Sequence, residues 1–149
     1  MVKKLKVSIK NVKFGKNVKI IEPVNLYDCS IGDNTFVGPF VEIQKNVKIG
    51  ENCRIQSHTF ICENVKIGNN CFIGHGVNFI NDKFTDKKLN RDSKKFLPTK
   101  ISNNVRIGSN STILPIEIDE NTVIGAGSVV TKNCVKNSKY FGNPAKKKW

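Results

Sequence analysis

The chain has 149 residues and a formal net charge of +13, with 25 Lys and Arg against 12 Asp and Glu. This length fits one domain over 1–149, and no apolar run approaches the roughly 20 residues that span a bilayer. The five cysteines are odd in number and form no C-x-x-C pair, which disfavours a zinc ribbon. We therefore expect a reduced, cytoplasmic chain without a signal peptide and without a membrane partner.

The positive charge favours anionic partners such as phosphates and nucleotides. Nearly all of it is Lys, since Arg occurs only at positions 54, 91 and 106. Nucleic-acid readers usually combine Arg with interleaved aromatic residues. We therefore expect no nucleic-acid partner, and we interpret the charge as a solvated basic surface.

An apolar residue recurs with a period of six through the first half of the chain. The series begins with Phe14, Ile20 and Leu26, and continues as Ile31, Val37, Ile43, Ile49, Ile55, Ile61, Ile67, Ile73 and Phe79. A small or β-branched residue stands four positions after each member from Ile31 to Ile73, and Gly often follows the aliphatic residue directly. An α-helix, with its repeat of 3.6, cannot produce this pattern.

Six residues hold one short strand and one corner, so three units make a triangular coil of eighteen residues. Stacked coils pair as parallel strands and bury the aliphatic residues between them. The sequence therefore predicts an all-β fold, a parallel β-helix. We expect the glycine after each aliphatic residue to supply the positive φ of a tight corner.

The period shortens to five between Leu26 and Ile31 and again between Ile113 and Ile118. We interpret both steps as tightened turns. The polar segment 82–100 lacks the repeat and is predicted to project as a loop, since long loops in compact domains are usually functional. Its residues Phe84, Phe96 and Leu97 are expected to dock, against a neighbouring subunit. Residues 131–149 lose the period and are predicted to cap the last coil.

Several segments resemble the hexapeptide-repeat acyltransferases, which carry a left-handed parallel β-helix. Ile124–Lys132 and Gly142–Lys146 are typical of acetyl-CoA-dependent members. Gln56–Cys62, Gly74–Asp82 and the opening Glu22–Tyr27 resemble N-acetyltransferases of nucleotide-linked 3-amino sugars. The resemblance implies a homotrimeric enzyme that moves acetyl from acetyl-CoA to the 3-amino group of a dTDP- or UDP-linked sugar, in bacterial surface-glycan (lipopolysaccharide) biosynthesis.

Acetyl transfer to an amine requires removal of a proton from the acceptor, and histidine is the usual base near neutral pH. The chain has two histidines, His58 and His75, separated by almost one coil, so both are expected at nearly the same corner. We predict that His75, which lies between two glycines, is catalytic. Asn81 and Asp82 are predicted to act with it, Asn81 by orienting the amine or thioester and Asp82 by orienting His75 or holding the ammonium.

The resemblance implies further binding residues for the sugar and for acetyl-CoA. The predicted substrate-binding residues are Gln56, His58 and Asn78. The predicted acetyl-CoA site comprises Gly125, Ala126, Gly127 and Ser128 along the pantetheine arm, with Lys132 and Lys146 at the phosphates.

Other functions remain open at this point. A β-helix of the γ-carbonic-anhydrase type needs three histidines around zinc, and this chain has two, so no metal is expected. A non-catalytic scaffold that binds an anionic surface would show a ladder of like residues on one face, whereas the outward positions look mixed. Acetylation of a sugar hydroxyl is the alternative enzyme activity, and it would depend on a base more strongly than acetylation of an amine does.

Overall fold

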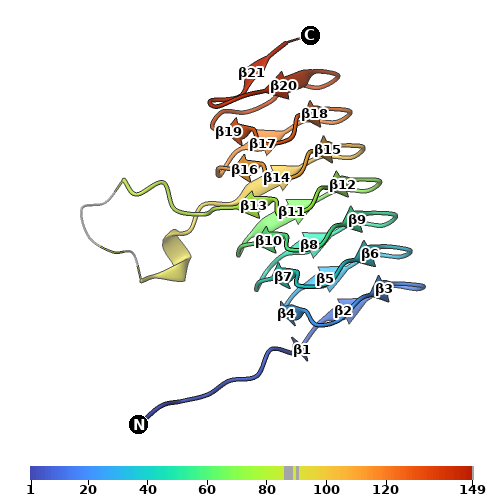
Figure 1. Cartoon of the computed structure of the whole chain (residues 1–149), viewed down its shortest axis with the longest axis vertical. Coiled ribbons are helices and arrows are strands. Elements are labelled where there is room, and N and C mark those ends of the chain that lie inside the picture. Colours follow the sequence, from blue (N-terminus) through green and yellow to red (C-terminus); the bar gives the residue numbers. More distant parts are fainter. Residues whose placement is uncertain (86–88, 90, 149) are drawn as a thin grey trace.

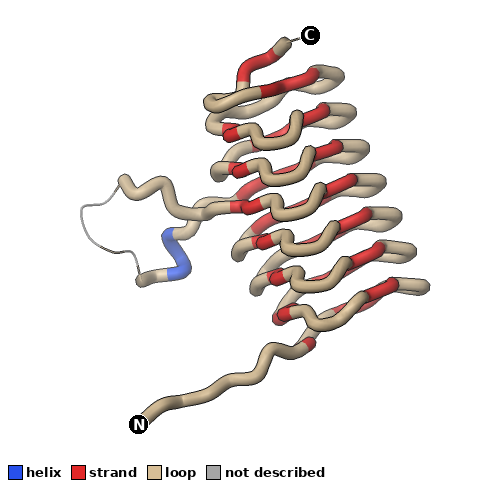
Figure 2. The backbone as a smooth tube through the Cα atoms, viewed as in Figure 1, coloured by secondary structure: helices blue, strands red, loops and turns tan. Residues whose placement is uncertain are grey.

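The structure is a computed structural model that describes residues 1–85, 89 and 91–148. The chain winds into a column of stacked coils, with its termini at opposite ends (Figure 1). Each regular coil contributes one short strand to each of three sheets, and turns connect the strands (Figure 2). The predicted parallel β-helix is confirmed. Among the described residues, no helix is long and apolar enough to cross a membrane.

The three sheets run along the column, and we name them A, B and C in chain order. Sheet A contains β1 (Ile9–Lys10), β4 (Asn25–Tyr27), β7 (Glu42–Ile43), β10 (Phe60–Ile61), β13 (Asn78–Phe79), β16 (Thr112–Ile113) and β19 (Val129–Val130). Sheet B contains β2 (Lys13–Phe14), β5 (Ser30–Ile31), β8 (Lys48–Ile49), β11 (Val65–Ile67), β14 (Thr99–Ile101) and β17 (Glu117–Ile118). Sheet C contains β3 (Lys19–Ile20), β6 (Phe36–Val37), β9 (Arg54–Ile55), β12 (Phe72–Ile73), β15 (Arg106–Ile107), β18 (Val123–Ile124), β20 (Lys139–Phe141) and β21 (Lys146–Lys147).

The aliphatic series fills the interior, because parallel pairing places each member above its equivalent in the previous coil. Ile55, Ile73 and Ile107 pair in register on sheet C and are fully buried. Burying a side chain of this size contributes roughly 1.5–3 kcal/mol. The series is wrong at its start, since Phe14 is 43% exposed and Ile20 only half-buried. The first coil has no complete coil beneath it to cover these side chains.

Asparagine, and not the predicted glycine, supplies most of the positive φ angles at the corners. Eleven corner asparagines have φ between 52° and 66°: Asn11, Asn17, Asn34, Asn46, Asn52, Asn64, Asn70, Asn104, Asn110, Asn121 and Asn137. Asparagine tolerates this conformation better than other side chains with a Cβ. Asn121 also links neighbouring coils through side-chain bonds to Asn104 (3.1 Å) and Asn137 (3.0 Å).

The glycine that follows the aliphatic residue is needed for a different reason. A Cβ on Gly108 would lie 2.4 Å from the backbone nitrogen of Ala126, and one on Gly74 would lie 2.6 Å from that of Ser109. Neither glycine has a positive φ. These positions therefore require glycine because the backbone of the next coil lies directly against them.

Two predicted irregularities lie where the period changes. The five-residue steps join β4 to β5 and β16 to β17 within the regular column, so both are tightened turns. The chain leaves the column after β13 and returns with β14 (Figure 1). The loop was predicted to end at Lys100, whereas β14 already begins at Thr99. A short 3-10 helix, η1 (Ser93–Lys95), lies in this excursion.

Phe84 and Leu97 in the excursion are exposed, and Phe96 is half-buried. Their docking against a neighbouring subunit stays a prediction, and residues 86–88 and 90 of the predicted loop lie outside the described residues. At the other end, β20 adds a last parallel strand to sheet C, and β21 folds back antiparallel against it. The antiparallel return covers the edge that the last coil would otherwise expose.

Candidate functional site

The candidate site lies along the corner between sheets C and A, formed by the turns 56–59, 74–77, 108–111 and 125–128. We call it the His75 corner. Backbone hydrogen bonds hold successive turns in register: Gly76 N donates to Ser57 O (3.0 Å), Asn110 N to His75 O (2.8 Å) and Gly127 N to Ser109 O (2.9 Å). These bonds align Ser57, His75, Ser109 and Ala126 in one column.

The ring of His75 is exposed, and its Nδ1 lies 2.8 Å from Ser57 Oγ. The backbone nitrogen of His75 donates to Ser109 Oγ at 3.2 Å. If Nδ1 carries the proton and donates it to Ser57, Nε2 is left as an acceptor. The contact with Ser57 therefore fixes the ring orientation, and in this tautomer Nε2 can act as a general base. Ser57 was not among the predicted site residues, although its spacing of eighteen from His75 places it directly beneath.

The surroundings of His75 are open on one side and fixed on the other. Gly76 has a φ of +64° and no side chain to cover the ring. Asn78 lies at the start of β13, and its Nδ2 donates to Gly76 O at 2.9 Å. This bond fixes the turn just after His75, while the rest of the exposed Asn78 amide remains available to a ligand.

The second histidine lies at the same corner, as expected, but it serves a different surface. The His58 ring packs on Phe40, with centroids 4.9 Å apart and planes inclined by 31°. Both residues have positive φ, and Phe40 is 57% exposed. A bulky residue in this conformation is uncommon. The pair forms an aromatic shelf below His75, and Phe40 is a second residue that the sequence analysis missed.

The predicted pantetheine stretch, 125–128, lies at the same corner as His75, beyond the intervening turn of Ser109. Two of its residues are structural: Gly125 is buried against Phe141, and the buried Ser128 Oγ accepts a hydrogen bond from Gly142 N at 3.1 Å. Ala126 and Gly127 are exposed, and a Cβ on Gly127 would have no atom within 4 Å. The open backbone at Ala126–Gly127 is therefore the part that a ligand can approach closely.

Two of the predicted catalytic residues lie away from this corner. Asn81 and Asp82 follow β13 and reach the next corner, between sheets A and B. Asp82 Oδ1 accepts from Phe84 N at 2.8 Å, and Asn81 O accepts from Leu97 N at 3.0 Å. Within one chain the structure does not bring either residue to His75, because β13 lies between them.

The remaining predicted residues are Gln56, Lys132 and Lys146. Gln56 is half-buried in the His75 corner, where its backbone carbonyl accepts from Thr59 Oγ1 at 2.8 Å. Lys132 is exposed after β19, at the corner between sheets A and B, and Lys146 is exposed in β21. The two lysines therefore lie on separate parts of the last coils.

The cysteines offer no accessible nucleophile. All five are free and buried. Burial raises the pKa of the Cys29 thiol to about 11 and the pKa of Cys62 and Cys134 to about 12. Reactivity belongs to the thiolate, which such an environment disfavours. In the part of the chain that the structure describes, no group of three or more His, Cys, Asp or Glu is placed to hold a metal ion.

Comparisons with known families agree with the repeat. "Bacterial transferase hexapeptide (six repeats)" matches residues 28–63, and "Hexapeptide repeat of succinyl-transferase" matches residues 64–77 and 98–132. The second match is interrupted where the chain leaves the column. The chain belongs to the hexapeptide-repeat family, as the resemblance predicted.

Among curated relatives, the bifunctional protein GlmU of Streptococcus uberis is 36% identical over 145 residues, which cover 90% of this chain and 31% of GlmU. The GlmU of Wigglesworthia glossinidia brevipalpis is 34% identical over 142 residues, which cover 88% of this chain and 30% of that GlmU. The chain thus spans less than a third of the length of these relatives.

Solved structures share the fold. A mutant of AntD, an N-acyltransferase from Bacillus cereus in complex with dTDP and coenzyme A, has a TM-score of 0.83 at 24% identity, with 92% of this chain and 82% of AntD covered. PerB from Caulobacter crescentus, in complex with CoA and GDP-perosamine, has a TM-score of 0.66 at 16% identity, with 95% and 57% covered.

Proposed function

We propose that this hexapeptide-repeat chain is an acetyl-CoA-dependent N-acetyltransferase that acts on the 3-amino group of a dTDP- or UDP-linked amino sugar. The observation that carries the proposal is the exposed His75, oriented by Ser57 at the same corner as the open backbone of Ala126–Gly127. The AntD and PerB structures contain coenzyme A with dTDP or a GDP-linked sugar, which supports this class of ligands.

In the proposed reaction, the sugar amine attacks the thioester carbonyl carbon of acetyl-CoA, while His75 Nε2 accepts the proton that the amine loses. Collapse of the tetrahedral intermediate breaks the carbon–sulfur bond, and the CoA thiolate takes up a proton. Ser57 holds the imidazole with Nε2 facing the acceptor. Proximity contributes strongly to such a step once both substrates lie along the corner.

We further propose a homotrimer in which sheet A lies at the subunit interface. The outward column of sheet A carries a single charge, and its members are Asn25, Glu42, Phe60, Asn78, Thr112 and Val129. Interface cores are depleted of charged residues. Asn81 and Asp82, at the far edge of sheet A, would then approach the His75 corner of the next subunit. The proposed enzyme acts in the cytoplasm, in bacterial surface-glycan biosynthesis.

The test is release of CoA from acetyl-CoA with three nucleotide-linked 3-amino sugars and one 4-amino sugar. Turnover with one of the 3-amino compounds is expected. His75→Ala should lower kcat by roughly 10²-fold or more and remove the acidic limb of the pH profile, whereas His58→Ala, the matched histidine control, should keep that limb. Absence of both turnover and acetyl-CoA binding would contradict the proposal and favour a non-catalytic scaffold.

Acetyl transfer to a sugar hydroxyl is the second candidate, and the Ser57–His75 contact favours it because a hydroxyl acceptor needs a base more than an amine does. The two candidates differ in their products. An ester product is cleaved by hydroxylamine, whereas an amide product survives, so treatment of the labelled product distinguishes them.

A further inference from the structure

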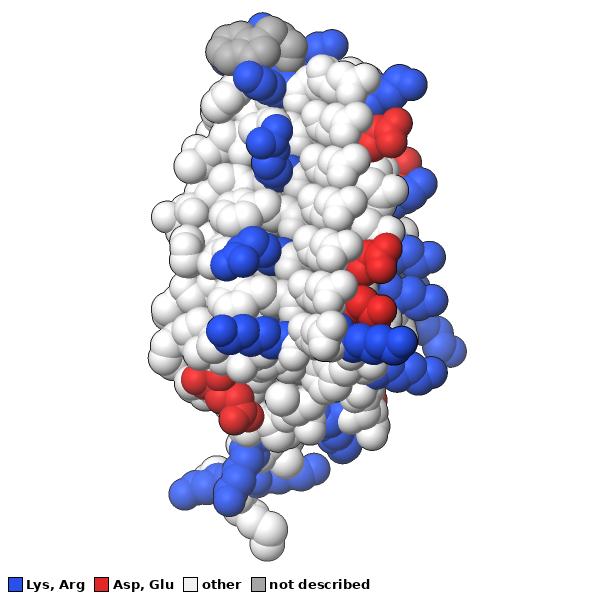
Figure 3. All heavy atoms as spheres, turned by 90° about the vertical axis from the view of Figure 1, so that its right-hand side faces the viewer, with Lys and Arg blue, Asp and Glu red and all other residues white. Residues whose placement is uncertain are grey.

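The outward face of sheet B carries a ladder of lysines. Parallel pairing aligns Lys48 of β8 with Lys66 of β11, and Lys66 with Lys100 of β14. The expectation that the outward positions are mixed therefore fails for these three successive strands, although Ser30 and Glu117 flank them in the same column. Figure 3 shows basic side chains on both sides of an uncharged column along the solenoid, with acidic side chains among them on one side.

The three lysines form a continuous positive strip along three successive strands. Adjacent strands lie about 4.8 Å apart, and all three side chains are exposed. Among the described residues, no carboxylate lies within 4.0 Å of any of them, whereas Lys45 pairs with Glu63 at 3.8 Å. Three like charges at this spacing repel one another, and a bound anion relieves that repulsion.

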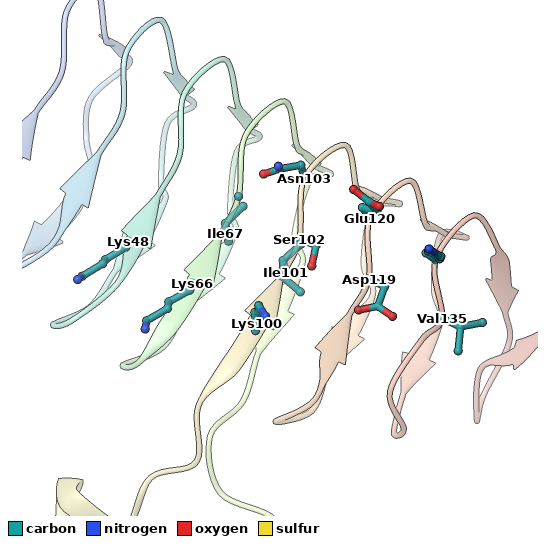
Figure 4. Close-up of a pocket in the computed structure, with 12 residues that line it drawn as sticks. Lys48, Lys66, Ile67, Lys100, Ile101, Ser102, Asn103, Asp119, Glu120 and Val135 are labelled. Carbon is teal, nitrogen blue, oxygen red and sulfur yellow. The ribbon is translucent and has the colours of Figure 1, made fainter.

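The strip lines a groove of about 810 Å³, which we call the sheet B groove. Lys48 and Lys66 project to the same side of successive strands, and Lys100 lies on the strand that follows (Figure 4). Asp119 and Glu120 line the other end of the same groove. The groove thus holds three lysines in register at one end and two carboxylates with a fourth lysine, Lys136, at the other.

The limits of the strip indicate the size of its ligand. Glu117 follows Lys100 in the outward column, and Ser30 precedes Lys48. A long polyanion running along the column would meet the carboxylates at one end, which repel it. Two or three lysines at strand spacing instead match one diphosphate, since lysine binds phosphate as a point charge.

The carboxylates indicate what is attached to that diphosphate. Asp119 and Glu120 accept hydrogen bonds from hydroxyl groups and repel further phosphates. Free sugar hydroxyls therefore fit this end of the groove, whereas a ribose that carries an additional phosphate, as in coenzyme A, does not. Ser102, between Lys100 and the carboxylates along the groove wall, adds a hydroxyl that can donate or accept.

We propose that the sheet B groove binds the diphosphate of a nucleoside diphosphate or nucleotide-linked sugar through Lys48, Lys66 and Lys100, with Asp119 and Glu120 on its sugar hydroxyls. The assignment rests on the proposed function for the nucleotide-linked class of ligand, but the binding itself requires no acetyl transfer. The face lies across the solenoid from the His75 corner of its own chain. A sugar held there can therefore react only at the His75 corner of another subunit.

The experiment is calorimetric titration of the whole chain, without acetyl-CoA, with UDP, UDP-glucose, inorganic pyrophosphate, coenzyme A and a single-stranded oligonucleotide. Lys66→Ala removes the centre of the ladder. Lys19→Ala is the matched control, because it removes the same charge from the equivalent strand position on sheet C. Loss of a charge-assisted contact should weaken UDP binding roughly tenfold or more in Lys66→Ala and leave Lys19→Ala within about twofold.

Support requires that UDP and UDP-glucose bind more tightly than pyrophosphate and that Glu120→Gln narrows this difference. Undetectable UDP binding, or UDP binding that is equal in Lys66→Ala and Lys19→Ala, would overturn the proposal. Tighter lysine-dependent binding of coenzyme A or of the oligonucleotide would also overturn it, in favour of those ligands. Lysine-dependent UDP binding without acetyl transfer would support nucleotide binding in the sheet B groove and reject the proposed enzyme activity. Acetyl transfer without UDP binding at the lysines would support the enzyme activity and reject the nucleotide site in the groove.

Discussion

Replacing each glycine beside His75 with alanine separates two reasons for a glycine at a corner. At Gly74 the added Cβ would lie 2.6 Å from Ser109 N and 2.9 Å from Gly108 C, against 3.4 Å or more for an ordinary contact. Both atoms belong to the backbone of the next coil, which cannot rotate away. At Gly76 the added Cβ meets only the side chain of Asn110, at 2.5 Å, and the difficulty is the φ of +64°.

The expected costs follow from these contacts. Relief of the clash at Gly74 lengthens the bonds from Gly74 N to Ile107 O (2.8 Å) and from His75 N to Ser109 Oγ (3.2 Å). Each bond contributes about 1 kcal/mol, and overpacking adds about 1–3 kcal/mol. We therefore expect Gly74→Ala to lose about 3–5 kcal/mol. Gly76→Ala should lose about 1 kcal/mol, since the left-handed conformation costs about 1–2 kcal/mol and alanine restricts the unfolded chain.

Urea unfolding at one protein concentration, followed by far-UV circular dichroism, measures the difference. Gly76→Asn provides the control, because asparagine adopts this φ at the equivalent corners and should restore most of the loss. If Gly76→Ala proved more destabilising than Gly74→Ala, or if Gly76→Asn gave no recovery, positive φ and not contact between coils would determine where glycine is required.

Three further outcomes are expected. Asn121→Ala should lower the free energy of unfolding by about 2 kcal/mol, because it removes two ladder bonds at 3.1 and 3.0 Å and places alanine at a φ of 56°; urea midpoints test this. The pKa of Cys62 and Cys134 is raised to about 12 in the folded chain, against 9.0 ordinarily. The free energy of unfolding should therefore fall as pH rises above about 9, because the thiols of the unfolded chain ionise first. Urea midpoints that stay constant from pH 7 to 11 would contradict this. Phe40→Ala should raise the KM for the nucleotide-linked sugar by roughly tenfold while kcat changes little, because the substitution removes the exposed ring of the aromatic shelf. A fall in kcat with an unchanged KM would instead place the ring at the reacting centre.

The fold was predictable because the solenoid repeats one local solution. The aliphatic series from Ile31 to Phe79 marks one buried position in each strand of that part of the column. The five-residue steps on either side of it mark the tightened turns. The role of each residue type at the corners was harder to predict from the sequence. Glycine permits both positive φ and close approach, and the sequence alone does not distinguish them. The asparagines that stand three positions after many of the aliphatic residues were the available signal, since asparagine is enriched in the left-handed region.

The candidate site was predictable where its residues share a corner. The near-coil spacing of His58 and His75 placed both at one corner, and the same arithmetic identifies Ser57. Asn81 and Asp82 differ because sequence proximity to His75 does not bring them close in space. A two-residue strand with its flanking turns separates the two corners, so residues six or seven positions apart lie at opposite edges of sheet A. Their predicted action on His75 therefore depends on a second subunit.

The lysine ladder was hidden by the excursion. Stacked residues are eighteen apart in regular coils, as Ser57 and His75 are, but thirty-four apart across the inserted segment, as His75 and Ser109 are. Lys48 and Lys66 follow the first spacing, and Lys66 and Lys100 follow the second. A search for one period therefore finds two lysines, which is unremarkable in a chain of this charge, and misses the third. In a solenoid, side chains meet by their register within the coil, so an insertion must be removed before outward positions are compared. Once it is removed, three of the lysines form a defined strip on sheet B. Its position across the column from His75 makes contact between subunits a requirement of the proposed reaction.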